Sequence, residues 1–194
     1  MKIGIDLDNT LINYEGVFYK AALEKCLIDP TTPKDKTSVK EAICTKDERL
    51  WTELQGYVYG SRLELALLYT GVLETLSYLA ENGSEFIIIS HKTRFPFLGP
   101  KYDLHKSAEE WIAKNLKLTF PHIKYIFCET IDEKVATINQ QNCDFFIDDL
   151  PKVLNYQGFP ANTERILFAP QKNQFKGLHC SSWQDILTLL KDRV

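Results

Sequence analysis

Short apolar runs alternate along the chain with segments whose apolar residues recur every three or four positions. The runs predict buried strands at residues 3–7, 86–90, 124–129, 143–148 and 165–169. The helical spacing predicts helices at residues 71–82, 104–112, 132–141 and 182–190. Strands that are apolar throughout and alternate with helices indicate an α/β fold, with a parallel sheet covered on both faces.

Residues at the predicted helix ends support these assignments. Asp103 is placed to accept a hydrogen bond as the N-cap of the helix that begins at residue 104, and Ser182 precedes the last helix in the same way. Asn82 and Gly83 are typical of the end of a helix.

Residues 14–70 interrupt the alternation of strands and helices. Helical patterns at 17–26 and 39–54 are separated by a break at 29–33, which contains two prolines. We interpret residues 14–70 as a small helical cap inserted after the first strand, and residues 1–13 with 71–194 as the core.

Composition narrows the class of protein. At 194 residues and 44% hydrophobic content, the chain can bury one core with a small accessory lobe. A formal net charge of -3 makes nucleic acid an unlikely partner. With no bilayer-length apolar run, no signal-peptide pattern and five scattered cysteines, we expect a cytoplasmic protein with reduced thiols and no membrane partner. The sequence does not predict an oligomeric state.

Polar residues gather where the predicted strands end. Ligands of open parallel sheets bind outside the carboxyl ends of the strands. Several acidic groups at one edge would repel one another without a cation, and hard carboxylate oxygens favour Mg²⁺. The residues at these strand ends are Asp6, Asp8, Ser90, Glu129, Asp148 and Asp149.

Four sequence features, most of them at these strand ends, together resemble the motifs of the haloacid dehalogenase superfamily. They are the DLDNT pentad at 6–10, Ser90 after an apolar strand, a lysine ahead of the last site strand, and the IDD triplet at 147–149. The resemblance implies a Rossmann-like, doubly wound parallel sheet and a magnesium-dependent phosphatase.

The resemblance also implies roles for the first motifs. Asp6 would be the nucleophile on phosphorus. Asp8 would protonate the leaving oxygen and then activate water, while its backbone carbonyl joins Asp6 in binding Mg²⁺. Thr10 would steady the loop by hydrogen bonding, and Ser90 would donate to a phosphoryl oxygen.

By the same resemblance, Lys134 would neutralise the phosphoryl group and Asp6. Its sequence position leaves Lys92, Lys101 and Lys124 as alternatives. Asp148 and Asp149 would anchor Mg²⁺, one directly and the other through water or by orienting Lys134. The resemblance favours Asp149 over Asp148 as the direct ligand.

The residues after Ser90 are candidates for substrate binding. His91, Lys92 and Arg94 would hold a second anionic group of the substrate, or would simply form a polar surface loop. The stiff, irregular segment at 95–100, rich in Phe, Pro and Gly, would shape the entrance.

The function predicted from the sequence is hydrolysis of a small phosphorylated metabolite through an aspartyl-phosphate. One alternative is a nucleotide phosphatase related to 5'-nucleotidases or deoxyribonucleotidases. Another is a noncatalytic module that binds a phosphorylated ligand. The presence of both Asp6 and Asp8 favours an enzyme.

Overall fold

The computed structural model describes residues 1–170 and 175–193. The chain divides into two compact units, each built from segments that are separated in sequence. The first unit holds residues 1–12, 68–92 and the described part of 116–194. The second holds residues 13–67 and 93–115.

The first unit is built on a six-stranded sheet in which every neighbouring pair is parallel. The strand order is β5-β4-β1-β6-β7-β8. The strands are β1 (Lys2–Ile5), β4 (Glu85–His91), β5 (Lys124–Cys128), β6 (Phe145–Asp148), β7 (Glu164–Phe168) and β8 (Leu178–Cys180). The predicted parallel sheet is therefore confirmed, with β8 as a strand that the apolar pattern did not indicate.

The strand order places β1 at the centre of a topological switch. After β1 the chain adds β4 and β5 on one side, then returns to add β6, β7 and β8 on the other. Ile5 pairs with Ile88 of β4 and with Ile147 of β6. The carboxyl ends of β1, β4 and β6 are therefore adjacent, at the place where open α/β sheets bind ligands.

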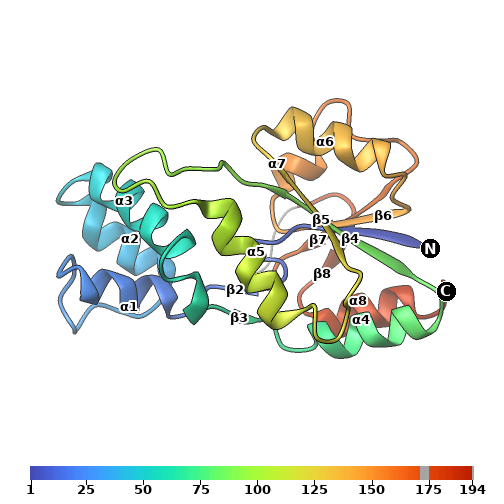
Figure 1. Cartoon of the computed structure of the whole chain (residues 1–194), viewed down its shortest axis with the longest axis horizontal. Coiled ribbons are helices and arrows are strands. Elements are labelled where there is room, and N and C mark those ends of the chain that lie inside the picture. Colours follow the sequence, from blue (N-terminus) through green and yellow to red (C-terminus); the bar gives the residue numbers. More distant parts are fainter. Residues whose placement is uncertain (171–174, 194) are drawn as a thin grey trace. The chain divides into compact units, whose positions relative to one another are not determined.

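Helices cover both faces of this sheet (Figure 1). One face carries α6 (Ile131–Gln140) and α7 (Pro151–Leu154), and the other carries α4 (Val72–Glu81) and α8 (Trp183–Leu190). Thr130 and Glu133 form a capping box at the start of α6. Because such a box satisfies the first free amides of the helix, it fixes where α6 begins.

The second unit is mainly helical. Its elements are α1 (Val17–Glu24), α2 (Lys36–Cys44), α3 (Glu48–Tyr59), the 3-10 helix η1 (Leu63–Leu65) and α5 (Leu104–Asn115). Two short strands, β2 (Ile12–Asn13) and β3 (Leu67–Leu68), form a separate sheet. As predicted, the side chain of Asp103 caps α5, accepting from the Lys106 amide at 3.0 Å.

The predicted helical stretch at 39–54 is two helices. α2 ends at Cys44, and Asp47 begins α3 by accepting a hydrogen bond from the Arg49 amide at 2.8 Å. An aspartate that caps from an extended backbone interrupts the helix, although the apolar spacing continues on both sides.

Residues 93–115 group with the second unit, whereas the sequence analysis assigned them to the core. Gly56 in α3 and Gly60, directly after that helix, account for part of this packing. A Cβ on Gly56 would lie 2.6 Å from Pro96, and one on Gly60 would lie 2.5 Å from Tyr102. The loop before α5 therefore approaches α3 as closely as a bare backbone allows. That the 14–70 segment acts as a cap stays a prediction.

Aromatic side chains form the core of the second unit. Phe18 stacks on Trp51 with ring centroids 5.1 Å apart, and Tyr59 meets both Tyr14 and Phe18 edge to face. Such pairs stabilise a small helical unit beyond the area that they bury.

All five cysteines are free thiols, and Cys128, Cys143 and Cys180 are buried. Over the ranges that the structure describes, every helix falls short of the length and apolar character needed to cross a bilayer.

Trp183 links the last helix to the loop after β1. It is fully buried, its indole N–H donates to the Thr10 carbonyl at 3.0 Å, and its own carbonyl accepts from the Thr75 hydroxyl at 2.9 Å. The C-terminal helix thus fixes the loop that carries Asp8.

We expect Trp183→Ala to lower the free energy of unfolding by about 3–5 kcal/mol, because it leaves a cavity and an unpaired carbonyl. Trp183→Phe, which keeps a ring, should cost about 1–2 kcal/mol. Urea denaturation measures both, with Leu118→Ala as an exposed control. A loss below about 0.5 kcal/mol for Trp183→Ala would contradict this role.

Candidate active site

Asp6 follows directly on β1 and is held by the sheet. Its amide donates to the Ile147 carbonyl at 2.9 Å. The chain then turns tightly, since the carbonyl of Leu7 accepts from the amides of both Leu11 and Ile12. Asn9 takes a left-handed conformation in this turn, with φ of 59°. Asparagine tolerates that conformation better than most residues, which suits the DLDNT sequence to the turn.

Lys134, in the first turn of α6, reaches two carboxylates. Its Nζ lies 2.6 Å from Asp6 Oδ1 and 2.7 Å from Asp148 Oδ2. All three side chains are buried. Among the lysines that the sequence left as alternatives, Lys101 and Lys124 are exposed and Lys92 pairs with Asp8. Among these lysines, the structure thus places Lys134 beside Asp6, and its predicted role there stays a prediction.

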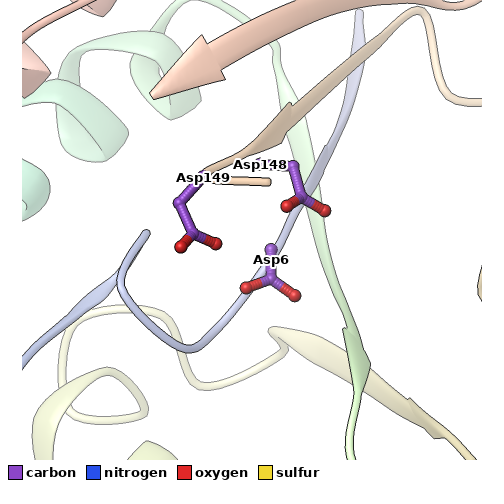
Figure 2. Close-up of side chains that lie close together, drawn as sticks. All are labelled: Asp6, Asp148 and Asp149. Atoms are coloured by element: carbon purple, nitrogen blue, oxygen red, sulfur yellow. The ribbon is translucent and has the colours of Figure 1, made fainter. Parts of the chain in front are cut away.

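Three carboxylates meet at the ends of β1 and β6. One oxygen from each of Asp6, Asp148 and Asp149 lies within 4.8 Å of the others. Figure 2 shows the three side chains side by side. Asp148 is fully engaged, because Oδ2 faces Lys134 and Oδ1 accepts from the Leu150 amide at 2.8 Å. The carboxylate of Asp149 has no hydrogen bond to any residue of 1–170 or 175–193.

Burial makes this cluster electrostatically unfavourable by itself. Burial raises the pKa of Asp6 to about 7, against the opposing effect of Lys134, and Asp148 and Asp8 add to the rise. Burial likewise raises the pKa of Asp149 to about 8, reinforced by the charges of Asp6 and Asp148. The pKa of Lys134 is raised, because the two carboxylates that it contacts outweigh the lowering effect of its burial. Each shift indicates a need for further positive charge.

The residues fit a divalent cation. The cluster of Asp6, Asp148 and Asp149 carries three formal negative charges when ionised, and Lys134 supplies one positive charge. The excess of two matches one divalent ion. The carboxylates of this cluster offer hard oxygen ligands, which suit Mg²⁺ better than they suit Zn²⁺.

Two buried hydroxyls belong to the predicted site. The Oγ of Ser90, near the end of β4, and the Oγ1 of Thr10 have no hydrogen-bond partner within the described parts of the chain. The hydrogen bond expected from Thr10 is therefore not formed by its side chain. Its carbonyl holds the loop instead, by accepting from Trp183. A buried hydroxyl without a partner is costly, so Ser90 is available for a ligand oxygen.

The three candidates for substrate binding after Ser90 lie in different surroundings. His91 is exposed, and its Nε2 is 3.1 Å from the Glu129 carbonyl. Lys92 is buried, with Nζ 2.7 Å from Asp8 Oδ2. Arg94 belongs to the second unit, where it pairs with Asp103 at 3.1 Å. Substrate binding by these residues stays a prediction.

Solved structures show what fold this is. A HAD-superfamily hydrolase from Ehrlichia chaffeensis is 18% identical, with a TM-score of 0.58 over 98% of this chain and 96% of that chain. A predicted phosphatase from Clostridium acetobutylicum is 16% identical, with a TM-score of 0.61 over 98% of both chains. A HAD-hydrolase from Bacillus subtilis bound to magnesium is 10% identical, with a TM-score of 0.56 over 97% of both.

This is the haloacid dehalogenase fold. The sequence itself matches no family model and no curated protein. The fold is therefore assigned by the structural comparison, and in this chain the four predicted motifs lie at β1, β4, α6 and β6.

Two contacts around these residues could not be predicted from the sequence. The Asp8–Lys92 pair has only a weak signal, namely a lysine two residues after a serine at a strand end. The Trp183–Thr10 contact has none, because it joins residues 173 positions apart through a backbone carbonyl.

Asp149→Asn is expected to stabilise the protein in a chelator while removing stabilisation by Mg²⁺. The substitution removes a buried carboxyl that must take up a proton or carry an unfavourable charge when the chain folds at pH 7.5. In EDTA at pH 7.5 we expect the melting temperature to rise by about 2–6 °C. Added Mg²⁺ should raise the melting temperature of the wild type clearly and that of the variant little.

The pH dependence of the protein's stability in a chelator follows from the pKa of Asp149. The folded state keeps the Asp149 proton up to about pH 8, whereas the ordinary value is 3.8. The folded state therefore binds more protons between these values, and the stability of the chelated wild type falls as pH rises through them. Asp149→Asn should flatten that fall. Glu129→Gln, an exposed carboxylate at the end of β5, is the control. A variant no more stable than wild type in EDTA would contradict the account.

Proposed function

We propose that the protein is a magnesium-dependent phosphatase that hydrolyses a small phosphomonoester through an aspartyl-phosphate on Asp6. The observation that carries the proposal is the position of Asp6. Its carboxylate contacts Lys134 and lies in one cluster with Asp148 and Asp149, at the switch point of the sheet. The likeness to solved phosphatases and hydrolases of the same fold supports it.

The chain's own residues would divide the reaction between them. Asp6 forms a bond to phosphorus while the bond from phosphorus to the leaving oxygen breaks, and Asp8 gives its proton to that oxygen. Asp8 then takes a proton from water, whose oxygen attacks phosphorus and restores the Asp6 carboxylate. Lys134 keeps Asp6 ionised, and Ser90 donates to a phosphoryl oxygen.

Mg²⁺ would be held by Asp6, by Asp149 and by the backbone carbonyl of Asp8. When bound it supplies positive charge to the phosphoryl oxygens and to Asp6. Asp148, whose two oxygens already accept from Lys134 and Leu150, would orient Lys134 rather than bind the ion directly. The magnesium reported for the Bacillus subtilis protein of this fold supports the choice of ion.

The test is release of phosphate from p-nitrophenyl phosphate with and without Mg²⁺. Asp6→Asn should lower kcat by roughly 10³-fold or more, because an amide cannot attack phosphorus. The wild type should lose activity in EDTA and recover it with Mg²⁺. Glu129→Gln, which removes a carboxylate outside the cluster, should stay within about twofold.

Equal turnover by wild type and Asp6→Asn would reject the nucleophile. Binding of phosphate esters without turnover by the wild type would favour the noncatalytic alternative. A panel of sugar phosphates against nucleoside monophosphates then separates a general phosphomonoesterase from a nucleotide phosphatase.

A further inference from the structure

A second buried lysine stands beside the second aspartate of the DLDNT motif. Lys92 Nζ lies 2.7 Å from Asp8 Oδ2. The Lys92 side chain is 3% exposed and that of Asp8 is 19% exposed. The pair is therefore nearly enclosed, and it is separate from the contacts that Lys134 makes with Asp6 and Asp148.

The backbone on both sides of this pair is fixed. The Lys92 amide donates to the Cys128 carbonyl at 2.8 Å, which extends the pairing of β4 with β5. Asp8 lies in the turn closed by the Leu7 carbonyl and forms a bridge with Ile12. These bonds fix the backbone of Asp8 and of Lys92. The contact with Lys92 acts on the side chain of Asp8, at its carboxylate.

Stability alone is a poor reason for such a pair. Taking an ammonium group out of water costs several kcal/mol, and the attraction of one carboxylate often does no more than offset that cost. An apolar side chain of the same length would fill the space at a smaller cost. The placement of a charged residue here therefore points to the chemistry of Asp8.

We propose that Lys92 is the positioning residue for Asp8. Its ammonium holds the Asp8 carboxyl in the one orientation from which that group serves first the leaving oxygen and then the attacking water. This inference rests on the proposed phosphatase function, in which Asp8 transfers both protons.

The pairing also distinguishes the two oxygens of Asp8. An ammonium group only donates hydrogen bonds, so Oδ2 accepts from Lys92. The proton that goes to the leaving oxygen is then carried on Oδ1, and the proton taken from water arrives there. Without Lys92 the carboxyl loses this contact and spends less time in the productive orientation.

A direct role in binding the substrate is the competing reading, since the sequence alone suggested that Lys92 holds an anionic group. The two roles differ in what they change. A lysine that binds substrate acts on KM whether or not Asp8 is present, whereas a positioning lysine acts on kcat and only through Asp8.

A double-mutant cycle on the full chain separates them. Lys92→Met, Asp8→Asn and the double variant are compared with the wild type, using p-nitrophenyl phosphate and saturating Mg²⁺. We expect Lys92→Met to lower kcat by about 10–100-fold, part of what a general acid and base contributes. KM should change less than threefold, and the double variant should match Asp8→Asn within about twofold.

The first turnover gives a second readout. Nitrophenolate leaves with little need of a proton, whereas hydrolysis of the aspartyl-phosphate needs Asp8 as a base. Lys92→Met should therefore release a burst of nitrophenolate approaching one equivalent per enzyme, followed by slow turnover. Lys92→Arg, which keeps the charge, should recover part of kcat. Lys124→Met makes the same change at an exposed lysine and should leave kcat and KM within twofold.

Three results would overturn the inference. They are a kcat for Lys92→Met within twofold of wild type, a tenfold rise in KM that persists in the Asp8→Asn background, and full additivity of the two substitutions. Thermal melting checks that each variant is folded. If Lys92→Met does not fold, Lys92→Gln takes its place in the cycle.

The controls keep this inference apart from the proposed function. If the wild type shows no magnesium-dependent turnover, the proposed function is rejected whatever the double-mutant cycle shows. If the wild type and Glu129→Gln turn over, Asp6→Asn does not, and the cycle is additive, only the positioning role of Lys92 fails.

Discussion

Two carboxylates at the ends of adjacent strands repel each other unless a cation lies between them, and the ammonium of Lys134 fills that place between Asp6 and Asp148. The contact joins β1, β6 and α6, which are far apart in sequence. Because all three groups are buried, removing Lys134 would leave two carboxylates inside the protein without their common counter-charge. The start of α6, fixed by its capping box, decides whether Lys134 reaches this place.

Some polar groups of the site have hydrogen-bond or ion-pair partners within the described part of the protein, and others do not. Lys134 and the Leu150 amide use both oxygens of Asp148, and Lys92 takes one oxygen of Asp8. Asp149 and the Ser90 hydroxyl are left with capacity for a ligand. Strain of this kind, stored in charged or polar groups with no partner, is typical of binding and catalytic sites.

The sequence was most informative where one local rule decides the structure. Apolar runs ending in Asp6, Ser90 and Asp148 predicted both the strands and the sheet edge that they share. The sequence was least informative where packing between distant segments decides the structure. Only the folded structure shows that Lys101 and Lys124 are exposed and therefore cannot take the place of Lys134. The loop at 93–103 packs in the second unit against bare backbone at Gly56 and Gly60, and no apolar pattern predicts such a contact. Asp47 divided a continuous helical pattern because capping outweighs spacing over a few residues.

The chain passes between the two units four times, near residues 12, 67, 92 and 115. The second unit is therefore not a single insertion that can be cut out at two peptide bonds. Its second segment is synthesised only after the strand that carries Ser90, so α3 emerges well before the loop and helix that pack against it. Evolution by exchange of this unit between related proteins would have to transfer both segments together, since either one alone would arrive without its complementary surface.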